Sequence, residues 1–233
     1  MVVKIAHRGD PGRVRENTLP SLASAIDAGG DWVEIDVKLT RDGVPVLLHD
    51  HTLERLWGVD RPIGAVAHAE LDGVRGDDGL RIPTLREALE LVVSRGVKVM
   101  VDIPGVAEAR AAAREAHDLG CLADVVFAGN LGGLADVRQR VPEAVIAMSW
   151  STPRLPKPEL LHRIRPAYLN PRHLYASRRM IRKMRERDIA LSVWTVDNPR
   201  RMAKLAAMGV DAIITNDIRA LVGVTGGRPA DRG

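Results

Sequence analysis

The sequence predicts an α/β protein that folds as a (β/α)8 TIM barrel, and three observations lead to that prediction. Short apolar, β-branched runs alternate with amphipathic segments along the whole 233-residue chain. Eight such runs are present, and they are apolar enough to be buried on both faces, as parallel strands are. Eight strand–helix units in a chain close to the typical length of about 250 residues favour a closed barrel over an open sheet.

The segments between the predicted strands have a helical period. In the first of them, Leu19, Leu22 and Ile26 fall on one face, and Gly29 follows its end. Glycine is common just after a helix because it adopts the left-handed backbone conformation without strain. The strands are expected at residues 2–6, 32–39, 97–103, 124–127, 144–149, 167–169, 189–195 and 211–215.

One segment interrupts this alternation after the second predicted strand. The run Arg41-Asp42-Gly43-Val44 indicates a hairpin, and residues 50–83 carry scattered Gly, Pro and Asp with little periodicity. We interpret residues 50–83 as a small insertion over the mouth of the barrel. It is expected to end where Thr84 caps the next helix, with Glu87 three residues later.

Composition narrows the partners that the protein is expected to have. Aromatic residues make up only 3% of the chain, which argues against stacking on single-stranded nucleic acid. The formal net charge is +4, and the basic run at residues 178–187 has the pattern of a solvated helix face. No nucleic-acid partner is therefore expected.

Nothing in the sequence suggests a membrane partner either. It has no apolar run of about 18 residues and no signal-peptide pattern, so we expect a cytoplasmic protein without stable membrane association. One domain is expected over residues 1–224, followed by a flexible tail at 225–233. The sequence does not indicate the oligomeric state.

Polar side chains gather at the ends of the first predicted strands. His7 and Arg8 follow the first strand, Glu34 and Asp36 share one face of the second, and Asp102 lies near the end of the third. Active sites of (β/α)8 barrels lie at the carboxyl ends of the strands. We therefore expect these groups to meet at one rim.

The predicted hairpin adds His49 to this group. If Asp42 and Gly43 are its two turn residues, His49 lies directly across from Asp36. A shift of the pairing by one residue would point His49 to the opposite face.

The acidic residues at these strand ends could serve as an acid/base pair, a glycosidase dyad or ligands of a hard metal ion. Glu34 and Asp36 share a strand and cannot flank a scissile bond, and the third acid, Asp102, favours metal binding. Three carboxylates suit Mg²⁺ or Ca²⁺, with Mn²⁺ as a further candidate, and no Cys/His cluster has zinc spacing. Simpler roles stay open, since Asp102 could cap a helix and either of the other two could be salt-bridged.

Two histidines beside three acids indicate proton transfer. The ordinary pKa of histidine lies near neutral pH, so His7 and His49 could each give or take a proton. Arg8 offers a planar fork for phosphate oxygens. Taken alone, His7 could instead be a structural histidine, and Arg8 could belong to a surface ion pair.

In combination, these motifs resemble the glycerophosphodiester phosphodiesterase family, and the resemblance covers nearly the whole chain. The family's motifs occur here in order: His7-Arg8-Gly9, Glu16-Asn17-Thr18, Glu34-Ile35-Asp36-Val37, Thr40-Arg41-Asp42-Gly43, His49-Asp50, Ile82-Pro83-Thr84-Leu85, Trp194-Thr195-Val196-Asp197-Asn198 and Gly209-Val210-Asp211-Ala212-Ile213-Ile214-Thr215.

The resemblance implies a barrel enzyme of lipid and glycerol metabolism. It would hydrolyse glycerophosphodiesters to sn-glycerol 3-phosphate and an alcohol with one divalent cation. The site residues that it implies are the acid/base pair His7 and His49, the phosphate-binding Arg8, the substrate-wall residue Trp194, and the metal ligands Glu34, Asp36 and Asp102.

The chain departs from the family pattern at two strand ends. The family usually has Glu-x-Lys where this chain has Asp102-Ile103-Pro104, so the third carboxylate is shorter and a lysine is absent. Thr215-Asn216-Asp217 stands in place of the usual Thr-Asp. Two alternatives to the hydrolase stay open: a related phospholipase or lyase that forms a cyclic phosphate, and a non-catalytic phosphodiester-binding homologue.

Overall fold

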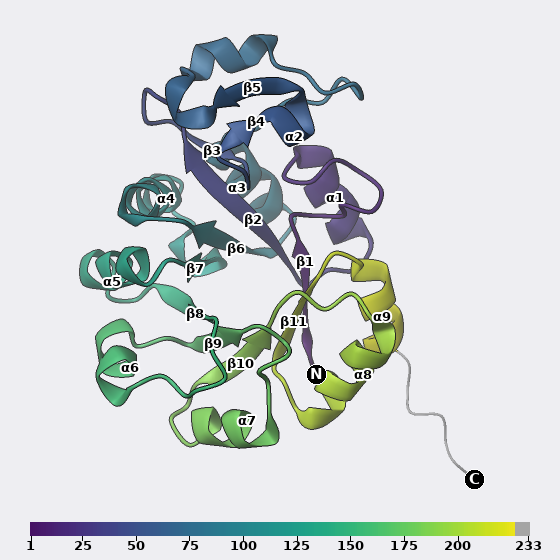
Figure 1. Ribbon diagram of the computed structural model, residues 1–233, viewed down its shortest axis with the longest axis vertical. Helices are drawn as coiled ribbons and strands as arrows, with labels where there is room; N and C mark the ends of the chain where they lie inside the picture. The colour runs from purple at the N-terminus through teal and green to yellow at the C-terminus, as the bar shows by residue number, and fades with distance from the viewer. Residues whose placement is uncertain (227–233) are drawn as a thin grey trace.

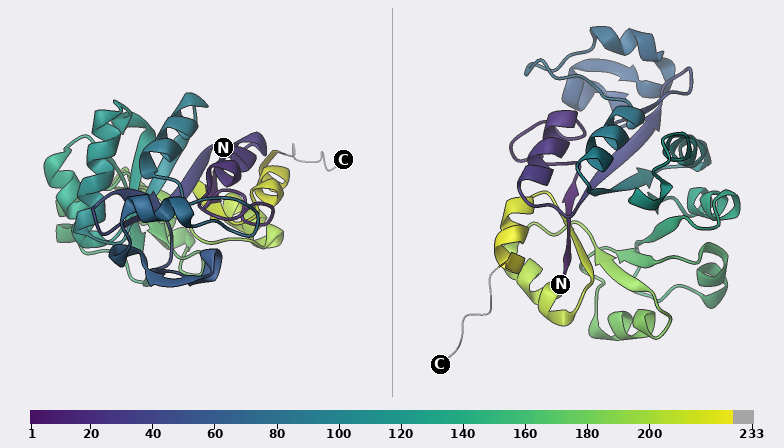
Figure 2. Two further views of the ribbon diagram at one scale, coloured as in Figure 1. Left: turned by 90° about the horizontal axis from the view of Figure 1, so that it is seen from above. Right: turned by 180° about the vertical axis from the view of Figure 1, so that it is seen from behind.

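A computed structural model describes residues 1–226, and within them eight parallel strands close into a barrel (Figure 1). The strand order is β1-β11-β10-β9-β8-β7-β6-β2, and pairing between β1 and β2 closes the cylinder. Helices follow the strands and surround the barrel on its outside, as the view from behind also shows (Figure 2). The predicted (β/α)8 fold is confirmed.

All eight predicted strands are present, and their ends differ from the predicted ends by no more than two residues. The barrel strands are β1 (Val3–His7), β2 (Trp32–Leu39), β6 (Lys98–Ile103), β7 (Val125–Gly129), β8 (Val145–Trp150), β9 (Tyr168–Pro171), β10 (Ala190–Val193) and β11 (Ala212–Thr215). The main helices are α1 (Leu19–Asp27), α3 (Leu85–Ser94), α4 (Val106–Asp118), α5 (Leu131–Arg140), α6 (Pro158–Ile164), α7 (Arg178–Arg185), α8 (Pro199–Met208) and α9 (Ile218–Gly226).

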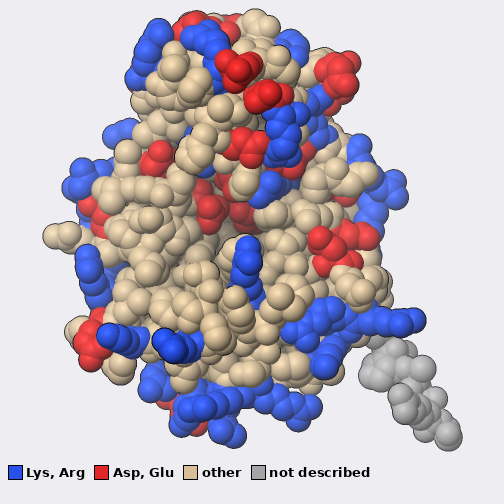
Figure 3. Space-filling view, in the orientation of Figure 1, with Lys and Arg blue, Asp and Glu red and all other residues tan. Residues whose placement is uncertain are grey.

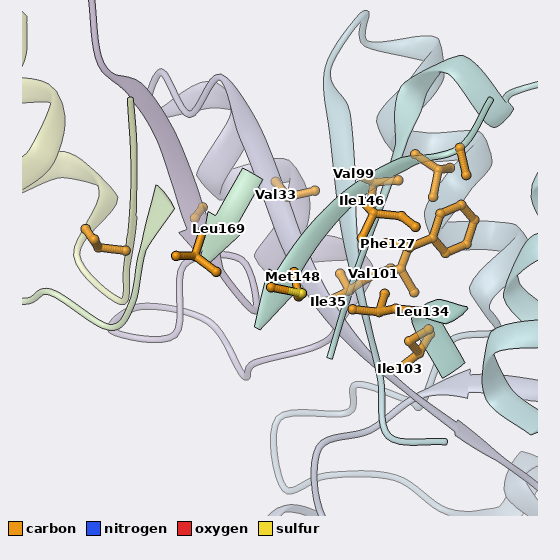
Figure 4. Packing of buried hydrophobic residues seen from close by; sticks show 14 of the residues in the cluster. Val33, Ile35, Val99, Val101, Ile103, Phe127, Leu134, Ile146, Met148 and Leu169 are labelled. Atoms are coloured by element: carbon orange, nitrogen blue, oxygen red, sulfur yellow. The ribbon is translucent and has the colours of Figure 1, made fainter. Parts of the chain in front are cut away.

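Alternate residues of each strand face either the helices or the barrel interior. Val33 and Ile35 of β2 and Val99 and Val101 of β6 point outward into the core beneath the helices (Figure 4). Met100 of β6 belongs to the separate cluster inside the barrel. The same alternation turns the intervening Glu34, Asp36 and Asp102 inward, where apolar side chains give way to polar ones.

Helix α3 begins as predicted, with Thr84 as its N-terminal cap and Glu87 three residues later. Thr84 accepts a hydrogen bond from the backbone N–H of Glu87, and the Glu87 carboxylate accepts one from the N–H of Thr84 at 2.9 Å. This reciprocal capping box pairs two backbone donors that the first helical turn leaves open.

The predicted two-residue turn of the hairpin is wrong. Thr40 N donates to Val44 O at 3.0 Å, so residues 41–43 form a three-residue turn. Gly43 has a φ of 81°, the left-handed conformation that such turns require at their last position. The hydroxyl of Thr40 also accepts the N–H of Val44 at 3.0 Å, which further stabilises this longer turn.

The extra turn residue shifts the pairing of the two arms by one residue. The return arm β3 (Pro45–Leu47) pairs Leu47 with Val37, so the predicted opposition of His49 and Asp36 does not occur. His49 nevertheless faces the barrel cavity. The reason is that β3 ends at Leu47 and the chain bends at His49, so strand alternation no longer sets the direction of this side chain.

The insertion lies beside the rim, and its predicted position over the mouth is also wrong. It contains β4 (Thr52–Leu53), α2 (Glu54–Trp57) and β5 (Val59–Pro62), with short 3-10 turns after them. Its side chains form a small core with Val46 and Leu48 of the return arm. This apolar contact holds the insertion beyond α1 and α3, away from the centre of the barrel (Figures 1 and 2).

The C-terminal helix extends further than the sequence indicates. Thr225 and Gly226, which the sequence places in the tail, belong to α9. The rest of the predicted tail, residues 227–233, lies outside the described residues. Among residues 1–226, no helix has the length and apolar character needed to cross a membrane.

Candidate active site

All seven predicted site residues, Trp194 among them, line one cavity of about 240 Å³ inside the carboxyl end of the barrel. In the space-filling view, acidic side chains lie at the floor of a hollow near the centre of this face (Figure 3). The lining also contains Met100, Ser149 and Asn170, which the sequence did not single out. The residues that line it are His7, Arg8, Glu34, Asp36, His49, Met100, Asp102, Ala128, Gly129, Ser149, Asn170, Trp194 and Ile214.

The turn after β1 requires its glycine. Gly9 has a φ of 92°, and a Cβ built there would lie 2.8 Å from the backbone oxygen of Ser21. Arg8 itself has a positive φ of 58°, a conformation that costs energy for a residue with a side chain. In this bend the N–H of Arg8 donates both to the backbone oxygen of Glu34 at 2.9 Å and to its carboxylate at 3.1 Å.

Two carboxylates hold the guanidinium of Arg8. Its Nη1 donates to Glu16 at 3.0 Å, and its Nε lies 3.0 Å from Asp36 Oδ2, as an ion pair without the angle of a hydrogen bond. Burial alone would raise the pKa of Glu16, but the hydrogen bond from Arg55 and the charge of Arg8 lower it on balance. Arg8 is therefore fixed at the cavity wall, with its direction set by anions.

Negative charge is concentrated where β2 and β6 run side by side. Asp36 pairs in register with Asp102, and Glu34 precedes Asp36 on the same face. Burial, and then repulsion by the other two acids, raise the pKa of Glu34 well above its ordinary value. Burial and the charge of Asp36 raise the pKa of Asp102 to about 6. Such shifts mark carboxylates whose charge the protein does not balance.

Asn17 positions Asp36, a role that the sequence did not reveal. Its Nδ2 donates to Asp36 Oδ2 at 2.8 Å, and its Oδ1 accepts the N–H of Asp36 at 3.2 Å. Asn17 is 1% exposed and has a φ of 54°, so it keeps an unusual backbone conformation to make these contacts. Its place in the Glu16-Asn17-Thr18 motif was the available signal.

The two imidazoles have different partners. Nδ1 of His7 lies 2.7 Å from Asn216 Oδ1, and its Nε2 faces Glu34 at 3.9 Å. Burial, and then the charge of Arg8, lower the pKa of His7, which favours its neutral form. His49 lies at the mouth, 45% exposed in its side chain, with Nδ1 2.7 Å from the Asp50 carboxylate.

Trp194 forms an apolar wall of the cavity. Its Nε1 donates to the backbone oxygen of Asn170 at 2.9 Å, which fixes the ring. The guanidinium of Arg172 lies over the Trp194 ring, 5.4 Å from its centroid. A fixed aromatic wall opposite polar groups suits a ligand with an apolar part.

The metal prediction concerns the carboxylates of Glu34, Asp36 and Asp102. Within residues 1–226 there is no group of three His, Cys, Asp or Glu side chains already arranged to hold an ion. Hydrogen bonds and ion pairs within the protein engage the carboxylates of Glu34 and Asp36. The donor chemistry is nevertheless suitable, because three hard oxygen donors with unbalanced charge face one cavity.

A buried lysine beside these acids was also missed. Lys38 is 9% exposed and follows Asp36 on the same face of β2. Its charge lowers the pKa of Asp102 against the effect of burial. Asp36 pairs with Asp102, and the same register continued for two residues along each chain would bring Lys38 level with Pro104.

The closed barrel and the polar groups at its rim place the protein among the TIM-barrel enzymes, whose active sites lie at the carboxyl ends of the strands. Residues 7–220 match the glycerophosphoryl diester phosphodiesterase family, and the chain belongs to this family. The resemblance seen in the sequence motifs is thus confirmed.

Individual relatives agree over nearly their full length. A glycerophosphodiester phosphodiesterase of Caldanaerobacter subterraneus subsp. tengcongensis is 28% identical, over 94% of this chain and 95% of its own. A solved phosphodiesterase of Oleispira antarctica, in complex with the product sn-glycerol-3-phosphate, is 25% identical with a TM-score of 0.84 and 96% of both chains covered. A glycerophosphodiester phosphodiesterase of Thermotoga maritima is 26% identical with a TM-score of 0.82, over 96% of this chain and 98% of its own.

Proposed function

We propose that the protein hydrolyses glycerophosphodiesters to sn-glycerol 3-phosphate and an alcohol. The observation that carries the proposal is the single cavity in which two histidines, three acids and Arg8 meet, in a chain that belongs to a phosphodiesterase family. The product named in the complex of the Oleispira antarctica relative has the expected chemistry. The substrate class that we favour is the deacylated diester, free of long acyl chains.

We further propose that Glu34, Asp36 and Asp102 hold one divalent cation, Mg²⁺, Ca²⁺ or Mn²⁺. The raised pKa values of Glu34 and Asp102 support this, because a cation would balance the charge that burial makes costly. Such an ion would polarise the phosphate and lower the pKa of a substrate hydroxyl beside it.

The histidines are assigned as an acid/base pair. Neutral His7 takes a proton at Nε2 from the attacking glycerol hydroxyl, and His49 gives one to the oxygen of the leaving alcohol. Water then opens the cyclic phosphate with the two roles reversed. The lowered pKa of His7 and the carboxylate partner of His49 support this division, because different surroundings separate an acid from a base.

Cations of the protein stabilise the negative phosphate. Arg8 faces the cavity from β1, and we assign a second contact to Lys38 at the end of β2. The register of β2 and β6, continued two residues past Asp36 and Asp102, would bring Lys38 level with Pro104, where the family pattern has its lysine. The charge missing at position 104 would thus come from the neighbouring strand.

Phosphorus NMR of the products tests the proposed function. Purified protein is given glycerophosphocholine, glycerophosphoethanolamine and glycerophosphoinositol, each with Mg²⁺, Ca²⁺, Mn²⁺ or a chelator. We expect the sn-glycerol 3-phosphate signal to grow with at least one cation and to stop growing with chelator.

Other outcomes identify the alternatives. A cyclic phosphate that accumulates as the end product would show the lyase. Diester binding without turnover under any cation would show the non-catalytic homologue. Full activity in chelator would contradict the metal site and leave the hydrolase assignment standing.

A further inference from the structure

The segments that follow β10 and β11 meet beside His7. β1 lies beside β11 (Figure 1) and pairs with it through Ala6 and Thr215. The residues that come next in the sequence, His7 and Asn216, are therefore in contact. Asp197 follows β10 and reaches the same place. The motifs that contain Asp197 and Asn216 were noted in the sequence, but neither residue had a role.

Asp197 receives three hydrogen bonds from the end of β11. Its Oδ1 accepts from the hydroxyl of Thr215 at 3.1 Å and from the backbone N–H of Asn216 at 2.8 Å. Its Oδ2 accepts from Nδ2 of Asn216 at 2.9 Å. An ionised carboxylate can only accept, so the Asn216 amide must turn its nitrogen toward Asp197.

This orientation decides which nitrogen of His7 carries the proton. With Nδ2 of Asn216 turned to Asp197, its Oδ1 faces Nδ1 of His7 at 2.7 Å. An amide oxygen accepts only, so Nδ1 of the neutral imidazole must be the donor. Nε2 then carries the lone pair and points toward the cavity and Glu34.

We propose that Asp197 and Asn216 are positioning residues, which hold His7 in the Nδ1-protonated tautomer and keep its Nε2 free to accept a proton. Asp197 acts only through Asn216. The proposal rests on the function assigned above to His7. It explains why the neutral amide of Asn216 is sufficient beside His7. The base needs a fixed tautomer, and a carboxylate in direct contact with the imidazole is not required.

The variant D197N tests this without a change to His7 or Asn216. The new amide at position 197 would turn its own Nδ2 toward Asn216, and the Asn216 amide would flip to present its oxygen there. His7 Nδ1 would then face a donor, so the proton should move to Nε2. Nitrogen-15 NMR of the imidazole, assigned by the signals lost in H7Q, should show this reversal, and kcat should fall by roughly 10²- to 10⁴-fold with little change in KM.

The double variant D197N/N216D is the rescue. The amide at position 197 would donate to the new carboxylate at position 216, and that carboxylate would accept from His7 Nδ1. The hydrogen bonds between the three side chains are thus restored with amide and carboxylate exchanged. We expect the wild-type tautomer and most of kcat to return.

The matched control is N198A. Asn198 follows Asp197 and caps α8 by accepting the N–H of Arg201. It takes no part in the contact between Asn216 and His7. This variant loses an asparagine side chain from the same loop. It should keep the wild-type tautomer and kcat.

Three results would overturn the proposal: an unchanged His7 tautomer in folded D197N, undiminished turnover in N216A, or a folded double variant that recovers neither property. The NMR measurement needs no turnover. If the wild type hydrolyses none of the diesters, the proposed function fails, while the nitrogen shifts still decide the positioning role.

Discussion

At the scale of single residues, Glu34 and Asp102 are the carboxyl groups of the site whose pKa values are raised. Burial, and then repulsion by the charge of Asp36, raise the pKa values of both groups. A bound divalent cation would relieve this repulsion, and a variant that lacks one carboxylate would lose one of the proposed ligands.

The first prediction concerns cation binding. D102N should bind Mn²⁺ or Mg²⁺ at least tenfold more weakly than the wild type, since even changes outside the ligand set cost about 10- to 100-fold. Isothermal titration calorimetry measures this without substrate. D118N changes an exposed acid at the end of α4 and should bind like the wild type. Equal affinity in D102N would remove Asp102 from the site.

The second prediction concerns Lys38. A hydrogen bond to a charged group contributes about 1.5–3 kcal/mol, so K38M should weaken the binding of sn-glycerol 3-phosphate by roughly 10- to 100-fold. K38R should retain most of the affinity. R41Q, on the exposed hairpin turn, serves as the charge-matched control and should bind normally. Normal binding by K38M would show that Lys38 only balances the neighbouring acids.

At the scale of elements, the turn after β1 links backbone geometry to the site. G9A places a methyl group against Ser21 in a left-handed conformation, so unfolding free energy should fall by about 1–3 kcal/mol. G12A lies in the same loop with no atom within 4 Å of its added carbon and should be nearly neutral. Chemical denaturation compares the two. Equal stabilities would show that the turn adjusts freely.

The capping box of α3 gives a prediction with a pH dependence. The hydrogen bond from Arg81, together with those from Thr84, lowers the pKa of Glu87 to about 2. A lowered pKa stabilises the fold above the ordinary value of 4.5, and this contribution is lost as the pH falls toward 2. E87Q should therefore be less stable by about 0.5–1 kcal/mol at neutral pH, with a smaller difference at low pH. A difference that grows on acidification would contradict this.

The hairpin shows where prediction of elements from sequence fails. The existence and position of the hairpin were predicted from Asp42 and Gly43, but its register depends on whether the turn has two residues or three. The longer turn is stabilised by the Thr40 hydroxyl, which bonds Val44 and Asp42 in the folded chain. Side-chain contacts of this kind are formed only on folding and leave no periodic signal.

At the scale of the whole molecule, the barrel was predictable because its strands are buried on both faces and separated by helices. The meeting of His7, Glu34, Asp36 and Asp102 followed from that topology alone, since parallel strands end at one rim. The contacts that orient them did not follow. Asn17, Asn216 and Asp197 act across turns between distant segments, which periodicity does not report.

The insertion could not be placed from sequence for a related reason. Its apolar residues are few and irregular, and their partners, Val46 and Leu48, belong to the hairpin arm. Their packing holds the insertion beside the rim. The described lining of the cavity accordingly contains no residue from 50–83.

The central claim is that both imidazoles serve one reaction at this rim, and the kcat of H49Q on glycerophosphocholine tests it most directly. Glutamine keeps the size and polarity of the side chain but cannot deliver a proton. We predict a kcat at least about 10²-fold below that of the wild type, with an unchanged melting temperature, and a similar loss in H7Q. Wild-type turnover by folded H49Q would contradict the account.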